Sequence, residues 1–203
     1  MLLTTIDRLR VTTIRQLMQI HDLGKYRNAA KVVADLAPYT HSYMEGEKII
    51  YLNKEGRKLI GSTREVKRSP LTVHMLLCNE AYIYFRCPLD WKTEYVLEHN
   101  EKASMSGLAI KIGISVKSAT VKKKIIADAA FSRNGYLHLV EIDNTRDMQD
   151  NRKKIEKYQE IIRVKKITNA KIYFFTATEN RKEKLQKWLQ GLNAHVLTFA
   201  EIK

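Results

Sequence analysis

The first sixty residues carry short apolar stripes at helical spacing, separated by polar stops. In the second stripe Ile14, Leu17 and Ile20 follow one another at intervals of three, and Thr12 or Thr13 stands where a helix cap is needed. The predicted elements are helices over 2–9, 14–23, 25–36 and 54–60, with a hairpin centred on Glu45-Gly46-Glu47. Three helices followed by a two-stranded wing are the element order of a winged helix-turn-helix.

The rest of the chain mixes helical and alternating patterns after a basic, aperiodic stretch at 63–69. Asn134-Gly135 lies between two apolar segments, and this dipeptide is the strongest short signal for a hairpin. Residues 100–121 show no clear period and are predicted to be mainly loop. The remaining predicted elements are a helix over 70–86, strands over 91–98, 122–131 and 136–143, a helix over 148–164, a strand over 171–176, a helix over 179–192 and a strand over 195–199.

These patterns predict an α+β protein of two domains, with residues 1–62 forming the winged helix, 63–69 a linker and 70–203 a second domain. The second domain reads αβββαβαβ from residue 70. Its hairpin and its later helix-connected strand together predict a mixed sheet.

The charge composition of the chain indicates the kind of partner that it binds. The chain has 36 Lys and Arg against 22 Asp and Glu, a net charge of +14. An excess of this size favours a polyanion, because each neutralised phosphate releases condensed counterions. No apolar run approaches the ~20 residues that cross a bilayer, and the N-terminus lacks a secretion leader. Two cysteines nine positions apart match neither a metal pair nor a disulfide framework, so a cytoplasmic protein with no membrane partner is expected.

Three carboxylates are the candidate chemistry. Glu141 and Asp143 are two apart on one strand, so their side chains share a face, and the predicted hairpin brings Asp128 close to them. Carboxylates that converge at strand ends can hold Mg²⁺, which can activate water against a phosphodiester. Acidic residues at strand ends are more often solvated, so this pattern alone leaves a metal site as one of two interpretations.

The carboxylates and the element order together resemble the PD-(D/E)XK nuclease superfamily, whose core is αβββαβ, or restriction-endonuclease-like. Ile-Ile-Ala-Asp128 stands where that superfamily has Pro-Asp, and Glu141-Ile142-Asp143 where it has Glu-x-Lys. The resemblance implies a metal site of Asp128, Glu141 and Asp143, with a further glutamate from the first core helix. Glu80 is the position that could match, and Glu94 is an alternative.

More narrowly, nearly the whole chain resembles the replication-relaxation family of Gram-positive plasmids and phages. That family combines a winged helix with such a domain, and Glu141-Ile142-Asp143-Asn144-Thr145 and Lys154-x-x-x-Tyr158 fit its pattern. The resemblance implies double-stranded DNA as partner, a role in replication or mobilisation or its control, and contact with a replication or mobilisation protein. A homodimer is also compatible.

Two departures bear on activity. Aspartate replaces the catalytic lysine at position 143, and no proline precedes Asp128. That lysine would stabilise charge in the transition state. Lys154 or Lys157 from the next helix, or Lys124 from the strand, could replace it. We therefore expect binding that needs no cofactor and proceeds without cleavage; if the protein is an enzyme, it is a Mg²⁺-dependent endonuclease with Asp128, Glu141, Asp143 and Lys154 as catalytic residues.

Two surfaces are candidates for DNA contact. The third helix would enter the major groove, and it begins with residues that can reach base edges and phosphates. In the second domain, lysines and arginines flank the carboxylates and suit phosphates rather than bases. Both could instead be ordinary solvated faces. The candidate residues are Lys25, Tyr26, Arg27, Asn28 and Lys31 in the first surface and Lys122, Lys123, Lys124, Arg152, Lys153 and Lys157 in the second.

The acidic tip of the wing argues against a simple DNA-binding role. Glu45 and Glu47 would repel phosphate, so a protein-interaction adaptor or a transcriptional regulator is a further alternative.

Overall fold

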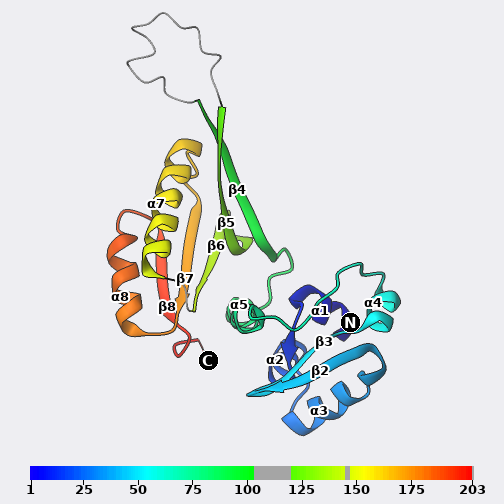
Figure 1. Ribbon diagram of the computed structural model, residues 1–203. Coiled ribbons are helices and arrows are strands. Elements are labelled where there is room, and N and C mark those ends of the chain that lie inside the picture. Colours follow the sequence, from blue (N-terminus) through cyan, green and yellow to red (C-terminus); the bar gives the residue numbers. More distant parts are fainter. Residues whose placement is uncertain (103–119, 145–146, 203) are drawn as a thin grey trace, which may run out of the picture. The chain divides into compact units, whose positions relative to one another are not determined.

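The structure is a computed structural model that describes residues 1–102, 120–144 and 147–202, with side chains over 1–98, 123–144 and 147–202 (Figure 1). Its contacts divide the chain into two compact units. The first unit consists of Met1–Leu89 and Thr198–Lys203, and the second of Asp90–Leu197. Both combine helices with a sheet, so the fold is α+β.

The first unit holds helices around a three-stranded antiparallel sheet. Its elements are α1 (Leu2–Leu9), β1 (Thr12–Thr13), α2 (Ile14–His21), α3 (Tyr26–Ala34), the 3₁₀ helix η1 (Ala37–Tyr39), β2 (Thr40–Glu45), β3 (Glu47–Leu52), α4 (Lys54–Ile60) and α5 (Thr72–Tyr84). The strand order is β1-β3-β2. Ile6, Leu17, Ala29, Val33 and Ile50 form the core that these elements share.

Local signals account for most of these boundaries. Thr13 caps α2, since its side-chain oxygen accepts from the backbone N–H of Gln16. Asn53 caps α4 through the N–H of Gly56, and Gly61 ends that helix in the left-handed conformation. The short strand β1, which pairs with Ile49 and Ile50, had no signal of its own because two residues cannot show a period.

The helix α5 packs with the first unit, which differs from the expected boundary at 63–69. Two polar side chains explain this packing. Asn79 donates to the carbonyl of Val11 (2.7 Å), and Gln16 donates to the carbonyl of Leu76 (3.0 Å). Buried amides need such partners, so these bonds fix α5 against α2 and β1. The helix that was expected to open the second domain therefore belongs to the first packing unit.

The second unit is a five-stranded mixed sheet. Its elements are β4 (Lys92–Lys102), β5 (Thr120–Arg133), β6 (Tyr136–Asp143), α7 (Met148–Lys165), β7 (Ala170–Thr176), α8 (Glu179–Trp188) and β8 (Ala194–Thr198). The strand order is β4-β5-β6-β7-β8, with β4, β5 and β6 antiparallel and β6 parallel to β7. Over the described residues the order from α5 onward is αβββαβαβ, as expected. Most of the loop expected over 100–121 lies outside the described residues.

The predicted hairpin is confirmed by the backbone. Asn134 and Gly135 both have positive φ, at 52° and 76°, and Arg133 pairs with Tyr136 across them. This two-residue turn sets the register of β5 against β6.

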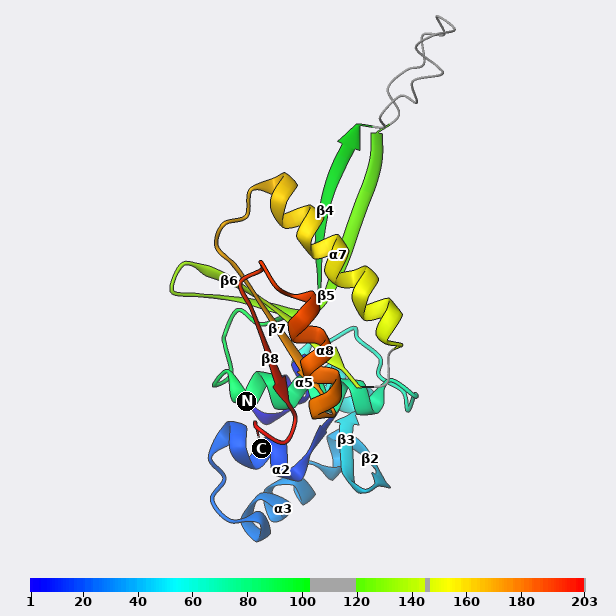
Figure 2. The ribbon, with the colours of Figure 1, turned by 90° about the vertical axis from the view of Figure 1, so that its left-hand side faces the viewer.

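Helices α7 and α8 lie against the same face of the sheet (Figures 1 and 2). The core between them contains Leu139 and Phe174 from the strands, Ile155 and Tyr158 from α7, and Leu185 from α8. Alternate residues of β6 point to this face, which places Glu141 and Asp143 under the helices. None of the helices described here is both long and apolar enough to cross a membrane.

Candidate functional site

Glu141 lies on the face of β6 that is covered by α7, with 1% of its surface exposed. Each of its oxygens has a donor from that helix. The ammonium of Lys154 donates to Oε2, and the hydroxyl of Tyr158 donates to Oε1 at 2.5 Å. Lys154 and Tyr158 are four residues apart on α7, so one helix face delivers both donors. The structure thus selects Lys154 among the three lysines that sequence reasoning left open.

Burial dominates the electrostatics of Glu141. Loss of solvation, and then the neighbouring charge of Asp128, raise the pKa of Glu141 to about 8, against the opposing effects of Lys154 and Tyr158. A carboxyl group with such a pKa keeps its proton near neutral pH. Perturbed acids of this kind are common at functional sites, but a buried structural pair gives the same shift.

Asp128 joins this group from the neighbouring strand. Its Oδ2 accepts the backbone N–H of Ile142 at 2.7 Å, just beyond the last paired residues of β5 and β6, Ala129 and Val140. At this point the side chain of Asp128 accepts a hydrogen bond that a backbone carbonyl of the neighbouring strand accepts in a regular sheet. Asp128, Glu141, Lys154 and Tyr158 therefore lie in one group, in which Lys154 and Tyr158 donate to Glu141 and the charge of Asp128 acts on it.

Asp143 is held separately, by partners from three different elements. Arg181, in the first turn of α8, forms a bidentate ion pair with it, with Nε to Oδ2 at 2.7 Å and Nη2 to Oδ1 at 2.6 Å. The amide of Asn151 and the hydroxyl of Thr176 each donate at 2.7 Å. Burial alone would raise the pKa of Asp143, but the bonds from Arg181, Asn151 and Thr176 together lower it.

Asn151, Thr176 and Arg181 had no role in the sequence interpretation. Arg181 follows Asp143 by 38 positions. Thr176 is brought to Asp143 by the register of the parallel strands β6 and β7, in which the two residues pair directly. The core sets that register, so no signal in the sequence could have identified these partners.

These bonds bear on metal binding. Glu141 and Asp143 each have both oxygens engaged by side-chain donors, and one oxygen of Asp128 accepts a backbone N–H. Among the residues that the structure describes, no three or more His, Cys, Asp or Glu side chains are grouped so that they could hold a metal ion. In this arrangement the carboxylates do not fit a Mg²⁺ site, since Mg²⁺ needs oxygens free to coordinate it.

The two further glutamates have other surroundings. Glu80 of α5 lies in the first unit, where Arg15 donates to both of its oxygens (2.6 and 3.1 Å) and Gln16 donates to Oε1 (2.5 Å). This ion pair accounts for its burial. Glu94 of β4 is exposed and has a φ of 54°, and it falls opposite Asp128, between the pairs Thr93–Ala129 and Tyr95–Ala127.

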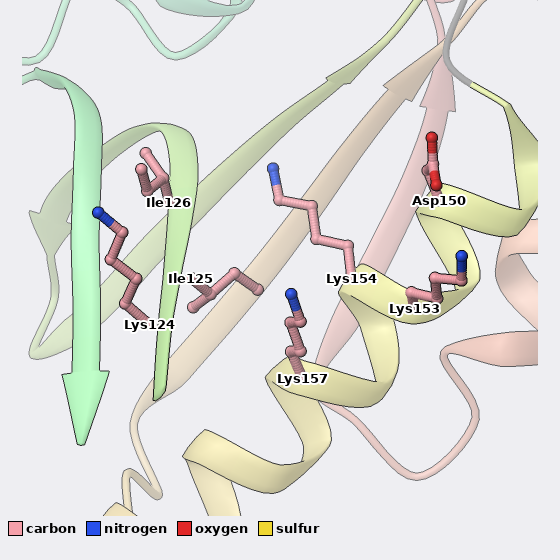
Figure 3. Close-up of a pocket in the computed structure, with 7 residues that line it drawn as sticks. All are labelled: Lys124, Ile125, Ile126, Asp150, Lys153, Lys154 and Lys157. Atoms are coloured by element: carbon pink, nitrogen blue, oxygen red, sulfur yellow. The ribbon is translucent and has the colours of Figure 1, made fainter. Parts of the chain in front are cut away.

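Two adjoining pockets lie between β5 and α7, beside Glu141. One, of about 310 Å³, is shown in Figure 3, where Lys154 and Lys157 extend from α7 toward β5. The other measures about 480 Å³. Together we call them the lysine groove. It is lined by Lys123, Lys124, Ile125, Ile126, Asp150, Lys153, Lys154, Lys157, Glu160 and Ile161.

Several predicted DNA-contact residues line this groove, namely Lys123, Lys124, Lys153 and Lys157. Arg152 lies on the exposed side of α7 and pairs with Glu156 at 3.3 Å. The side chain of Lys122 lies outside the described residues. The structure thus gathers most of the second basic surface along one groove.

The first basic surface is the N-terminal half of α3. The side chains of Lys25, Tyr26, Arg27, Asn28 and Lys31 are exposed, while Ala29 and Val33 on the opposite face are buried. Asn28 donates to the carbonyl of Leu23 at 2.8 Å, which braces the turn before the helix. The same helix therefore packs through its small apolar residues and presents its basic ones to solvent.

The acidic hairpin tip has cationic neighbours. Glu47 pairs with Arg15 at 3.4 Å and Glu45 with Arg68 at 3.5 Å. Exposed pairs of this kind contribute at most about 1 kcal/mol, but they offset part of the negative charge that counted against DNA contact.

Comparisons with known proteins extend this description. No curated protein matches the sequence. Among solved structures, the crystal structure of protein VC1899 from Vibrio cholerae aligns at 15% identity, with a TM-score of 0.40, over 88% of this chain. The chain spans 40% of that protein, and a likeness this distant indicates neither a shared fold nor a shared function. The family model of replication-relaxation proteins, in contrast, matches residues 3–178, which include most of both units. The chain belongs to the replication-relaxation family.

Proposed function

We propose that this protein binds double-stranded DNA in the replication or mobilisation of a plasmid or phage, without cutting it. Membership of the replication-relaxation family suggests a role in such processes, with DNA or replication proteins as partners. In this proposal the first unit is a winged helix, and the second is a PD-(D/E)XK-like domain that holds DNA.

The exposed basic half of α3 carries the proposal. In a winged helix the helix after the turn enters the major groove through its N-terminal residues. Arg27 and Asn28 are of the types that pair with guanine and adenine, and Lys25 and Lys31 suit the flanking phosphates. The net charge of +14 supplies the general attraction.

The test is the affinity for a 30-base-pair duplex, measured by fluorescence anisotropy at several salt concentrations. Changing Arg27 and Lys31 to Ala together should weaken binding at least tenfold and make the slope of log K against log salt shallower by about 1, since Lys31 is the phosphate contact that is lost and each such contact contributes about 0.9. Changing Lys184 and Lys187 of α8 to Ala removes the same charge elsewhere and serves as the control. Equal losses in both variants would leave α3 without a specific role.

The proposal of binding without cleavage rests on Asp143 and its partners. At the position where a nuclease of this superfamily has lysine, this chain has an aspartate whose two oxygens are taken up by Arg181, Asn151 and Thr176. Breaking this buried ion pair to free the carboxylate for a metal would cost several kcal/mol. The arrangement is therefore suited to stabilising the domain.

A second candidate, a Mg²⁺-dependent endonuclease or nickase, is favoured by one contact. Lys154 reaches Glu141 and so supplies, from a helix, the cation missing at position 143. Such an enzyme would lose its activity on changing Asp128 or Glu141 to Ala. A protein-interaction adaptor is the third candidate, and binding to duplex DNA separates it from the other two.

A further inference from the structure

The lysine groove has cations on both of its walls. Lys154 and Lys157 project from α7, and Lys124 lines the groove from β5 with its ammonium directed away from α7 (Figure 3). Lys124 and Lys157 line both of the adjoining pockets, so they stand at the middle of the groove. From Asp150 to Ile161 the α7 wall extends about 16 Å, at ~1.5 Å per residue.

The charge of the groove is not balanced by its own acids. Five lysines face two carboxylates, those of Asp150 and Glu160. Glu160 pairs with Lys123 at 2.5 Å. Over the part of the chain with described side chains, Lys124, Lys153 and Lys157 have no carboxylate within 4.0 Å, the ion-pair limit, so the middle of the groove keeps a net positive charge.

The floor and the size of the groove define what fits it. Ile125 and Ile161 are buried beneath it, and Ile126 is 40% exposed at its side. Cavities of roughly 300–1,000 Å³ hold small-molecule ligands, so each pocket has room for about one nucleotide. The phosphates of a single strand can face the lysines of the α7 wall while its sugars cover the isoleucines. A duplex can present only its outer, charged backbone to such a groove.

We propose that the lysine groove binds one strand of DNA through its phosphates, so that the second unit prefers single-stranded to duplex DNA. Lysines act here as point charges, and the sequence of the strand is not read. This inference rests on the proposed DNA-binding function but names a different form of DNA for the second unit. A protein with duplex recognition in α3 and a strand-binding groove is suited to DNA that is being opened.

Glu141 and Tyr158 take part as positioning residues. Glu141 lies beneath the groove, fully buried, and its bond with Lys154 holds that ammonium at the groove wall. Tyr158 in turn fixes the carboxyl group of Glu141 through its hydroxyl. A pair that would be a catalytic feature in a nuclease thus keeps one cation in place along the strand.

The experiment measures binding of the full chain to a fluorescein-labelled dT₁₅ oligonucleotide and to a 15-base-pair duplex. The groove variant changes Lys124 and Lys157 to Gln, the matched control changes Lys184 and Lys187 of α8 to Gln, and a third variant changes Arg27 and Lys31 to Ala. All six positions are exposed, so folding should be retained; circular dichroism verifies it.

We expect wild-type binding to dT₁₅ to fall about twentyfold between 50 and 200 mM salt, because three phosphate contacts give a slope of about −2 for single strands. The affinity of the groove variant for dT₁₅ should fall only about threefold over the same salt range, since one phosphate contact then remains. It should also bind dT₁₅ at least tenfold more weakly than the control at 50 mM salt, and its duplex binding should change less than its dT₁₅ binding.

Three results would overturn the inference. They are equal losses of dT₁₅ binding in the groove and control variants, a groove variant that loses duplex binding as strongly as dT₁₅ binding, and a wild type that does not bind dT₁₅. Failure of the proposed duplex recognition is seen separately. In that case the α3 variant would bind the duplex as tightly as the wild type does, while the groove variant would still bind dT₁₅ more weakly.

Discussion

Changing Arg181 to Met tests whether Asp143 serves as a structural anchor of the second unit. Arg181 supplies two of the four bonds that satisfy the Asp143 carboxylate, which is 1% exposed. Methionine keeps much of the length of the side chain and removes its charge. The carboxylate would then be buried with only the donors of Asn151 and Thr176.

Breaking a buried ion pair by removing one partner costs about 3–5 kcal/mol. The Arg181 side chain is 23% exposed and two neutral donors remain, so we expect a loss of about 2–3 kcal/mol in the free energy of unfolding. For a protein of this size that corresponds to a fall of about 5–10 °C in Tm.

Urea unfolding followed by tryptophan fluorescence measures this loss in the second unit alone. The chain has two tryptophans, Trp91 and Trp188, and both belong to that unit. Trp91 is buried and stacks on Phe131, so its emission reports packing of the sheet. Lys184→Ala, on the exposed side of α8, should change the unfolding free energy by less than about 0.5 kcal/mol.

The dependence on pH adds a second readout. Asp143 has a lowered pKa in the folded protein, so the stability it contributes is present above its ordinary pKa and is lost as pH falls through the folded value. In Arg181→Met the largest lowering influence is gone and burial raises the pKa instead. The gap between wild type and variant should therefore narrow on acidification from pH 7 toward 4. A loss below about 0.5 kcal/mol at pH 7, or a gap that widens on acidification, would refute this reasoning.

Three further predictions follow from single contacts. The pKa of Glu141 is raised to about 8, so the free energy of unfolding of the second unit should decline as pH rises from about 4.5 to 8, by at most about 1.4 kcal/mol per pH unit. Glu141→Gln should remove this decline. A variant whose tryptophan-monitored unfolding has the same pH profile as the wild type would contradict the prediction. Tyr158→Phe removes a donor from the buried Glu141 carboxyl and should cost about 1–3 kcal/mol in the same assay; a neutral effect would show that the bond is unimportant. Gly56→Ala places a Cβ 2.1 Å from the carbonyl oxygen of Tyr39, so the first unit should lose at least about 1–3 kcal/mol by thermal circular dichroism, whereas Lys58→Ala on the same helix should not.

The sequence predicted those features that local chemistry decides. Asn134-Gly135 specified the turn between β5 and β6. Thr13, one of the two candidate caps, stands at the start of α2 because its side chain satisfies a free backbone N–H group. Element order was accessible for the same reason, since several long elements keep apolar periods of two or of three to four residues and β7 is a continuous apolar run.

Features that depend on register between distant segments were not accessible. The partners of Asp143 come from α7, β7 and α8, and no local pattern marks Arg181 as one of them. Glu80 shows the same limit in reverse. The family resemblance made it a candidate site residue, but Arg15, 65 positions earlier, is the partner that compensates for its burial. Lys154 was accessible as one of three candidates, and only the packing of α7 on β6 selected it.

Binding without cleavage is tested most directly by one gel experiment on supercoiled plasmid. The protein is incubated with the plasmid and Mg²⁺ or Mn²⁺, and each sample is run before and after protease digestion. We predict a retarded plasmid band before digestion and an intact supercoiled band after it. Nicked plasmid that appears with the wild type, and disappears in Asp128→Ala and Glu141→Ala, would contradict the proposal and establish a metal-dependent nuclease.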